Sequence, residues 1–334
     1  MPDAATQPLV TLADIRAAAD RLRGVALRTP LLPFERNAYL KPESLQPTGA
    51  FKLRGAYNAI AQLSAEQQRR GVVTHSSGNH GQAVAYVCRL LAIPVVVVMP
   101  DDAPRIKIAR VEQNGARIVF VGRSHEERRE RAHQLAERDG RSLIPSADDE
   151  RVIAGQGTIG LEIVEQLTEL GGLPTDLTVL LPIGGGGLAA GVSTAVGSLL
   201  PRARIVGVEP VLAADARDSL VRGEIVRWSS DAVGRTMADG LRMESVGSRP
   251  FAQLRRYLAG VLTVEEQEIG SAVAQAASRA RLVLEPSGAV SLAALLFHRE
   301  ELAGSTVVAV LSGGNVDPER YAALLRRYHR ADGP

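Results

Sequence analysis

Short runs of branched apolar residues recur along the chain, and each is followed by glycine or a turn and then by a helical pattern. The runs occupy residues 72–74, 95–98, 117–121, 179–183, 205–208 and 307–311. Strands that are apolar at nearly every position are typical of parallel sheets whose two faces are both covered by helices. The pattern therefore predicts an α/β fold with parallel sheets covered by helices.

Two segments between these runs have a clear helical pattern. Residues 11–22 form an amphipathic stretch in which Thr11 can cap the helix and Asp14 follows three residues later. A second stretch begins at Ser124 and carries opposite charges at helical-neighbour spacing. We expect this second helix to lie on the solvated surface.

Length and charge narrow the class of partner. A chain of 334 residues is long enough for two domains or one large α/β unit. Its 39 Lys and Arg against 37 Asp and Glu give a net charge of +2, so the sequence makes no electrostatic case for nucleic acid or a membrane surface. No apolar stretch reaches the roughly 18 residues that span a bilayer. A small-molecule partner is favoured.

The compartment is indicated by cysteine usage and by the start of the chain. Cys88 is the single cysteine, so no internal disulfide framework can form, and it lies in an apolar run typical of a buried structural thiol. The opening residues Met1-Pro-Asp-Ala-Ala have no charged-then-apolar signal pattern. We therefore expect a cytoplasmic protein.

Lys52 is the first candidate for chemistry. It lies in the string Gln46-Pro-Thr-Gly-Ala-Phe-Lys-Leu-Arg-Gly55, where Phe51 can pack against a flat ring and the glycines allow close backbone approach. A lysine condenses with an aldehyde only when its amine is neutral, and burial lowers its pKa toward that state. Taken alone, a lysine in a turn is more often simply exposed, so the assignment depends on the motifs that follow.

Four consecutive glycines, Gly184, Gly185, Gly186 and Gly187, follow the apolar run 179–183 and precede Leu188 and a helical stretch. Backbone N–H groups at the start of a helix are suited to binding a phosphate. The run matches neither the phosphate loop that ends in Lys-Ser/Thr nor a G-x-G-x-x-G fingerprint with its acidic partner, so a kinase or dehydrogenase is not indicated. A plain flexible turn is the alternative.

Two further polar motifs end apolar runs. They are Ser76-Ser-Gly-Asn-His-Gly-Gln82 and Leu311-Ser-Gly-Gly-Asn315. Together and in this order, the four motifs resemble those of the fold-type II pyridoxal phosphate enzymes, and within them the serine/threonine dehydratase and serine racemase branch. His80 supports this branch, because the related cysteine synthases normally have threonine there. The resemblance covers nearly the whole chain.

The resemblance implies a two-domain tryptophan-synthase-β-like fold with the cofactor in the interdomain cleft. The polar breaks 69–71 and 147–151 are the candidate crossings. Residues 1–68 and 150–334 would form the large cofactor-binding domain, and residues 69–149 a small inserted domain. Such clefts at the carboxyl ends of parallel strands are the usual ligand site in these sheets.

Residue roles are carried over position by position. Lys52 would form the Schiff base and remove the α-proton, and Ser77 would face the opposite side of the α-carbon and deliver a proton there, as in the racemases. The implied contacts of pyridoxal 5'-phosphate are Phe51, Lys52, Asn79, Gly184, Gly185, Gly186, Gly187, Leu188, Glu285 and Ser312. The implied substrate contacts are Ser76, Ser77, Asn79 and His80. For Glu285, an ordinary acidic turn residue remains an alternative.

A metal site is also implied. Glu209, Ala213 and Asp215 match the positions at which metal-dependent members bind Mg²⁺ or Ca²⁺ through two carboxylates and one backbone carbonyl. Oxygen-only ligation suits these hard cations. Solvated surface carboxylates are the alternative.

The expected activity is that of an ammonia-lyase, or dehydratase, which converts L-serine or L-threonine to a 2-keto acid and ammonia, and a homodimer is implied. A serine or other amino-acid racemase and a threo-3-hydroxyaspartate dehydratase are rival enzymes. A weakly catalytic cofactor-binding or regulatory protein is a rival of another class. The chain departs from the family pattern at Pro145-Ser-Ala147, where His-Pro-Phe or His-Pro-Asn is common, and at Met243-Glu244, where racemases have a serine pair. These departures leave the substrate open.

Overall fold

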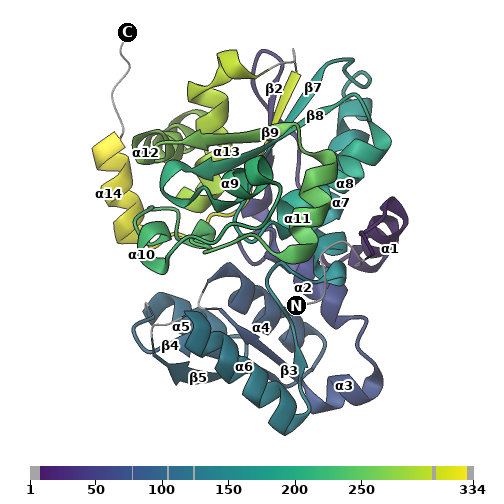
Figure 1. Cartoon of the computed structure of the whole chain (residues 1–334), viewed down its shortest axis with the longest axis vertical. Helices are drawn as coiled ribbons and strands as arrows, with labels where there is room; N and C mark the ends of the chain where they lie inside the picture. Colours follow the sequence, from purple (N-terminus) through teal and green to yellow (C-terminus); the bar gives the residue numbers. More distant parts are fainter. Residues whose placement is uncertain (1–7, 77, 104, 123–124, 303–305, 329–334) are drawn as a thin grey trace.

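The computed structural model describes residues 8–76, 78–103, 105–122, 125–302 and 306–328. Its strands form two separate sheets (Figure 1). The six-stranded sheet has the order β1 (Leu32–Glu35), β2 (Ala38–Pro42), β10 (Thr306–Leu311), β7 (Leu177–Pro182), β8 (Arg204–Pro210) and β9 (Gly260–Val264). The four-stranded sheet has the order β5 (Arg117–Val121), β4 (Val95–Pro100), β3 (Val72–His75) and β6 (Ser142–Leu143).

Every strand pair is parallel except β1 with β2, which are antiparallel. The α/β class with parallel sheets is thus confirmed, and each of the six predicted apolar runs lies in a strand. β1, β2, β6 and β9 were not predicted, because they are short or only partly apolar.

The sheets are covered by helices on both faces. These helices are α1 (Leu12–Leu22), α2 (Lys52–Ile60), α3 (Ala65–Arg70), α4 (Asn79–Leu90), α5 (Arg105–Glu112), α6 (His125–Asp139), α7 (Glu150–Glu169), α8 (Gly187–Leu199), α9 (Asp215–Arg222), α10 (Ser230–Val233), α11 (Ser248–Tyr257), α12 (Glu266–Gln275), α13 (Pro286–Phe297) and α14 (Pro318–Tyr328). Short 3₁₀ turns include η3 (Val211–Ala213) and η4 (Asp239–Leu241). We call the six-stranded sheet with its helices the large lobe, and the four-stranded sheet with α4, α5 and α6 the small lobe.

Alternate residues of the central strands enter different cores. Val179 and Leu181 of β7 pack with α1, α7 and α8, whereas Leu180 packs with α12 and α13 on the other face. Because successive strand residues point to opposite faces, a strand covered on both sides must be apolar throughout. This explains the continuous apolar runs of the sequence.

α2 links the two lobes. Its apolar residues Leu53, Ala56 and Ile60 share a core with Val72 and Val97 of the four-stranded sheet, while the helix also packs against α7 of the large lobe. Figure 1 shows α2 between the two sheets. The catalytic candidate Lys52, the first residue of α2, is therefore held where the lobes meet.

The predicted helix at residues 11–22 is confirmed as α1, with Thr11 and Asp14 forming a reciprocal capping box. The predicted charged helix is α6, although the expected capping residue Ser124 lies outside the described residues. Among the helices of the described segments, none has the length and apolar character needed to cross a membrane.

Candidate functional site

A cavity of about 490 Å³ lies between the lobes. It is reached by segments that follow the carboxyl ends of β3, β7 and β10. This is the edge at which parallel sheets usually bind ligands. Most of the residues singled out in the sequence line it: Phe51, Lys52, Ser76, Asn79, His80, Gly184, Gly185, Gly186, Gly187, Leu188, Glu285 and Ser312. Ser77 lies outside the described residues.

The Lys52 amine is the nucleophile candidate of the cavity. Its Nζ donates a hydrogen bond to the Ser146 carbonyl at 2.6 Å and lies 4.8 Å from the centroid of the Phe51 ring. Withdrawal from bulk water lowers the pKa of this amine to about 8. A substantial neutral fraction near neutral pH is what addition to a carbonyl requires.

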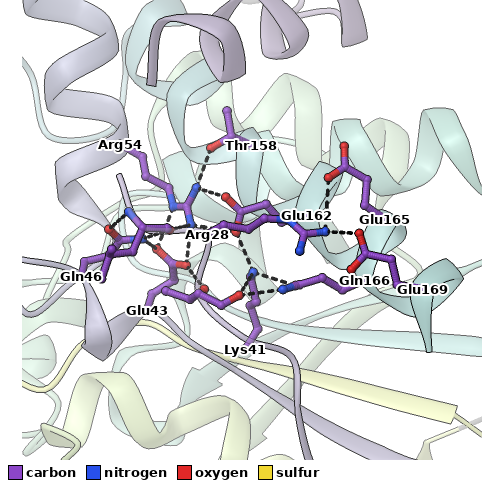
Figure 2. A network of polar contacts seen from close by, with 12 residues as sticks. Arg28, Lys41, Glu43, Gln46, Arg54, Thr158, Glu162, Glu165, Gln166 and Glu169 are labelled. Carbon is purple, nitrogen blue, oxygen red and sulfur yellow. Dashed lines mark hydrogen bonds and ion pairs between the residues drawn. The ribbon is translucent and has the colours of Figure 1, made fainter. Parts of the chain in front are cut away.

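A buried charge network fixes the start of α2 (Figure 2). The Arg54 guanidinium, two residues after Lys52, bonds the carboxylates of Glu43 and Glu162 at 2.6 to 2.9 Å. Lys41 on β2 bonds the same Glu162 at 2.6 Å. Sequence reasoning missed this network, because nothing in a local motif shows that residues on β2, α2 and α7 converge.

Charge pairing sets the ionisation of these groups. Burial alone would raise the pKa of the Glu43 carboxyl, but the nearby Arg54 holds it below its usual value. Glu43 and Arg54 are each at most 1% exposed. Paired in this way, they anchor the α2 backbone that carries Lys52 against α7 and β2.

The glycine run forms the turn between β7 and α8. Gly186 has a φ of +86°, and a Cβ there would approach Pro250 at 2.7 Å and Val246 at 2.8 Å. A Cβ on Gly185 or Gly187 would come within about 3 Å of Ala147. Glycine is thus required by both backbone conformation and packing. The N–H groups of this turn, at the start of a 13-residue helix, suit a phosphate.

Asn79 is held by two residues of the large lobe. Its Nδ2 donates to Glu285 Oε1 at 2.5 Å, and its Oδ1 accepts from Asn315 Nδ2 at 2.9 Å. Burial, followed by the nearby Asp239 carboxylate, raises the pKa of Glu285 to about 7. Asn315 was not singled out in the sequence, although it ends the motif that contains Ser312.

His80 is almost completely buried at the cavity wall. Its Nε2 lies 2.9 Å from the Ile144 carbonyl, so Nε2 carries the hydrogen and Nδ1 is the bare nitrogen. Burial and the positive charge of Lys52 lower the pKa of the ring to about 3. His80 is therefore a neutral hydrogen-bonding group.

The other hydroxyls of the site have modest partners. Ser312 Oγ lies 3.4 Å from the Ser287 carbonyl, and Ser76 Oγ accepts from the Gly78 N–H at 3.2 Å. Ser312 remains close enough to the cavity to offer its hydroxyl to a ligand.

Three cations of the small lobe also line the cavity: Lys107 and Arg110 on α5, and Arg128 on α6. Lys107 Nζ bonds Asp239 Oδ2 at 2.9 Å, and Arg110 Nη1 bonds Asn315 Oδ1 at 3.0 Å. Sequence reasoning singled out Arg128 alone as a possible substrate contact. The positive lining favours a ligand with more than one anionic group.

The metal candidates lie at the end of β8. Glu209 is fully buried and accepts from the N–H groups of Ala216 and Arg217, while Asp215 is fully buried and its two carboxylate oxygens have no hydrogen-bond partner among the described residues. Burial raises the pKa of Asp215 to about 7, and burial together with Asp215 raises the pKa of Glu209. Ala213 in η3 is buried beside them.

This chemistry fits a hard divalent cation, which would supply the missing partner for the Asp215 carboxylate. Within the described segments, no group of three or more His, Cys, Asp or Glu residues gathers in a metal-binding arrangement. A site here would therefore combine the two carboxylates with backbone or water oxygens.

Comparisons with known proteins agree with this site. The family model described as pyridoxal-phosphate dependent enzyme matches residues 22–313. An L-threo-3-hydroxyaspartate ammonia-lyase of Saccharomyces cerevisiae is 39% identical over 97% of this chain and 98% of its own. A serine racemase of Schizosaccharomyces pombe is 36% identical over 95% of this chain and 98% of its own.

Solved structures give the same result. The crystal structure of a threonine deaminase named as from T.th. superposes with a TM-score of 0.86 at 43% identity, covering 92% of this chain and 99% of that one. The matching relatives are thus carbon–nitrogen lyases and racemases that share the whole fold. With a family match that spans the lysine, the glycine turn and the last strand, the chain belongs to the pyridoxal-phosphate dependent enzymes.

Proposed function

We propose that this protein is a pyridoxal phosphate-dependent ammonia-lyase that converts a small β-hydroxy amino acid to a 2-keto acid and ammonia. The observation that carries the proposal is the position of Lys52. Its amine has a pKa of about 8 and lies in the same cavity as a glycine turn suited to phosphate. The similarity to ammonia-lyases over nearly the full chain supports the reaction type.

The cavity fits the cofactor in size and in donor groups. A phosphate would be bound by the N–H groups of Gly184, Gly185, Gly186, Gly187 and Leu188. Asn79 would donate to the phenolic oxygen, and the Ser312 hydroxyl would bond the pyridine nitrogen. Phe51 would pack beside the ring. We infer these roles from the resemblance, and the placement of all these residues on one cavity supports them.

The bound cofactor would supply an electron-withdrawing ring that stabilises negative charge on the substrate α-carbon. Lys52 would take the α-proton when its amine is neutral, and the β-hydroxyl would depart as water. Ser76 and His80 at the cavity wall would orient the substrate carboxylate and amine. The released enamine would then be hydrolysed, giving the 2-keto acid and ammonia.

The substrate is the least determined part of the proposal. L-serine and L-threonine are the first candidates, and threo-3-hydroxyaspartate is favoured by the cations Lys107, Arg110 and Arg128 on one side of the cavity. A second carboxylate would find an opposite charge there. The similarity to two hydroxyaspartate ammonia-lyases at 39% identity supports this candidate.

We also propose that Glu209, Ala213 and Asp215 bind Mg²⁺ or Ca²⁺ in a structural or activating role. The buried Asp215 carboxylate without a hydrogen-bond partner in the described part of the chain supports this site. Domain boundaries at 1–68 with 150–334 and at 69–149 remain our proposal, as does a cytoplasmic location.

A homodimer is proposed as well. The side chains of Leu27, Leu45 and Val283 are 44 to 51% exposed. Their segments adjoin, because Gln46 bonds the Leu27 backbone and Gly314 packs between Val283 and Ser44. Burying such apolar surface against a second copy would remove it from water. Light scattering of the wild type and of Leu45→Glu would test this.

The central test is release of 2-keto acid by the cofactor-loaded protein from serine, threonine and threo-3-hydroxyaspartate, with Lys52→Ala as the control. We expect release from at least one substrate and none from the variant. Accumulation of the D-amino acid without keto acid would identify a racemase instead. Cofactor binding without turnover of any substrate would favour a binding or regulatory protein.

A further inference from the structure

α5 of the small lobe extends two cationic side chains across the cavity mouth to the large lobe. Lys107 and Arg110 are three residues apart, so they share one face of this helix. Lys107 bonds Asp239 in η4, and Arg110 bonds Asn315, which follows β10. The two partners belong to different segments of the large lobe. Arg110 thus makes a contact that joins the lobes beside Asn79.

Asn315 is the junction of this contact. Its Oδ1 accepts from Arg110 Nη1 at 3.0 Å, and its Nδ2 donates both to the Thr48 carbonyl at 2.8 Å and to Asn79 Oδ1 at 2.9 Å. Both hydrogens of Nδ2 are therefore used. The amide also packs tightly, because a Cβ on Gly49 would lie 2.4 Å from Asn315 Oδ1.

The chemistry of the two ends gives this chain of amides a direction. An arginine can only donate hydrogen bonds, so Asn315 must present its oxygen to Arg110 and its NH₂ group to Asn79. Asn79 must then present its own oxygen to Asn315. Its NH₂ group is left facing Glu285 and the cavity, with one N–H bound to Glu285 and the second N–H not used by either residue.

We propose that Arg110 is a positioning residue for the cofactor: through Asn315 it orients the Asn79 amide so that an N–H points to the cofactor's phenolic oxygen. This inference rests on the proposed function, in which Asn79 donates to that oxygen. Reversal of the Asn79 amide would place two acceptors, its own oxygen and the phenolic oxygen, against each other. Because Arg110 and Asn79 both belong to the small lobe and Asn315 to the large lobe, the orientation is set only while the lobes are in contact.

The experiment compares substitutions at Arg110 with the same substitutions at Arg105, an exposed arginine on the same helix that does not line the cavity. Arg110→Met removes the donor, Arg110→Glu replaces it with an acceptor, and Arg110→Lys retains a donor. Arg105→Met and Arg105→Glu are the matched controls. Pyridoxal phosphate itself is the probe, and far-UV circular dichroism confirms that each variant is folded.

Two readouts are independent of turnover: the ratio of the absorption bands of the bound cofactor, which responds to hydrogen bonding at its phenolic oxygen, and the dissociation constant for pyridoxal phosphate. For Arg110→Met we expect a changed band ratio and about two- to tenfold weaker binding, the effect of one hydrogen bond. Arg110→Glu should change both more strongly, and Arg110→Lys should restore most of both. The kcat should fall with little change in KM.

Band ratios and dissociation constants for the Arg110 variants equal to those of the Arg105 variants would overturn the proposal. So would an Arg110→Glu variant no worse than Arg110→Met, because the direction of the amides would then be irrelevant. If Arg110→Met does not fold, the comparison of Arg110→Lys with Arg110→Glu decides. A wild-type protein that forms no imine with pyridoxal phosphate, or a Lys52→Ala variant that still forms one, would instead refute the proposed function.

Discussion

Replacement of Arg54 by methionine should destabilise the protein strongly, although Arg54 does not line the main cavity. The Arg54 side chain makes six hydrogen bonds, four of them to the carboxylates of Glu43 and Glu162. Methionine has a similar length and would fill much of the space. The variant would therefore remove the charge and its hydrogen bonds, while the two carboxylates would remain.

The magnitude follows from how the two carboxylates are left. Glu162 retains Lys41 as a partner at 2.6 Å, whereas Glu43 is fully buried and retains only the neutral donors Thr29 and Gln46. Removing one partner of a buried ion pair costs about 3 to 5 kcal/mol. With a urea m-value of about 3 kcal/mol/M, the unfolding midpoint should fall by about 1 to 1.7 M.

The loss should also depend on pH. In the wild type, Arg54 holds the pKa of Glu43 below its usual value, so this pair stabilises the fold at neutral pH and is lost as pH falls through that low pKa. In the variant, burial without Arg54 should raise the pKa of Glu43 above its unfolded value. Protonation would then relieve the variant as pH falls, so the difference between the two proteins should shrink below neutral pH.

The assay is urea unfolding followed by far-UV circular dichroism at several pH values, with Arg69→Met as a surface control. The double variant Arg54→Met with Glu43→Gln should recover part of the loss, because it removes the uncompensated charge. A midpoint within about 0.2 M of the Arg69→Met control would refute the reasoning, since surface substitutions usually change stability by no more than about 0.5 kcal/mol. So would a loss that grows as the pH is lowered.

Three further predictions concern the site. Because the neutral form of Lys52 is the base, the rate of the elimination should rise through about pH 8 rather than near 10.5, and a pH–rate profile with its limb near 10.5 would contradict the lowered pKa. Gly186→Ala should weaken cofactor binding at least tenfold, because its φ is +86° and its Cβ would meet Pro250, whereas Gly24→Ala has open space and should leave binding unchanged despite a similar φ. Without a cation, the raised pKa of Asp215, about 7 against 3.8, should make stability fall as pH rises from about 4 to 7. Mg²⁺ or Ca²⁺ should raise the melting temperature at neutral pH, and Asp215→Asn should abolish that response; an equal response in the variant would exclude the site.

Local patterns in the sequence were sufficient for the elements that are apolar throughout. The runs at 72–74, 95–98 and 307–311 are strands because helices cover both faces of each sheet. By contrast, β1 is only half buried, and β6 has just two residues, so neither has a periodic signal. Their pairing depends on the neighbouring strands β2 and β3, which only the folded chain provides.

The same distinction applies to the site. Lys52 and the glycine run at 184–187 could be identified from sequence, because their chemistry depends on a few consecutive residues: a lysine at the start of a helix and a turn that no Cβ can enter. Only the tertiary structure decided the partners of these motifs. Arg54 meets Glu162 and Arg110 meets Asn315 across separations of 108 and 205 residues. Such contacts leave no local pattern, because they depend on how α2, α5 and α7 are oriented when the two lobes pack together.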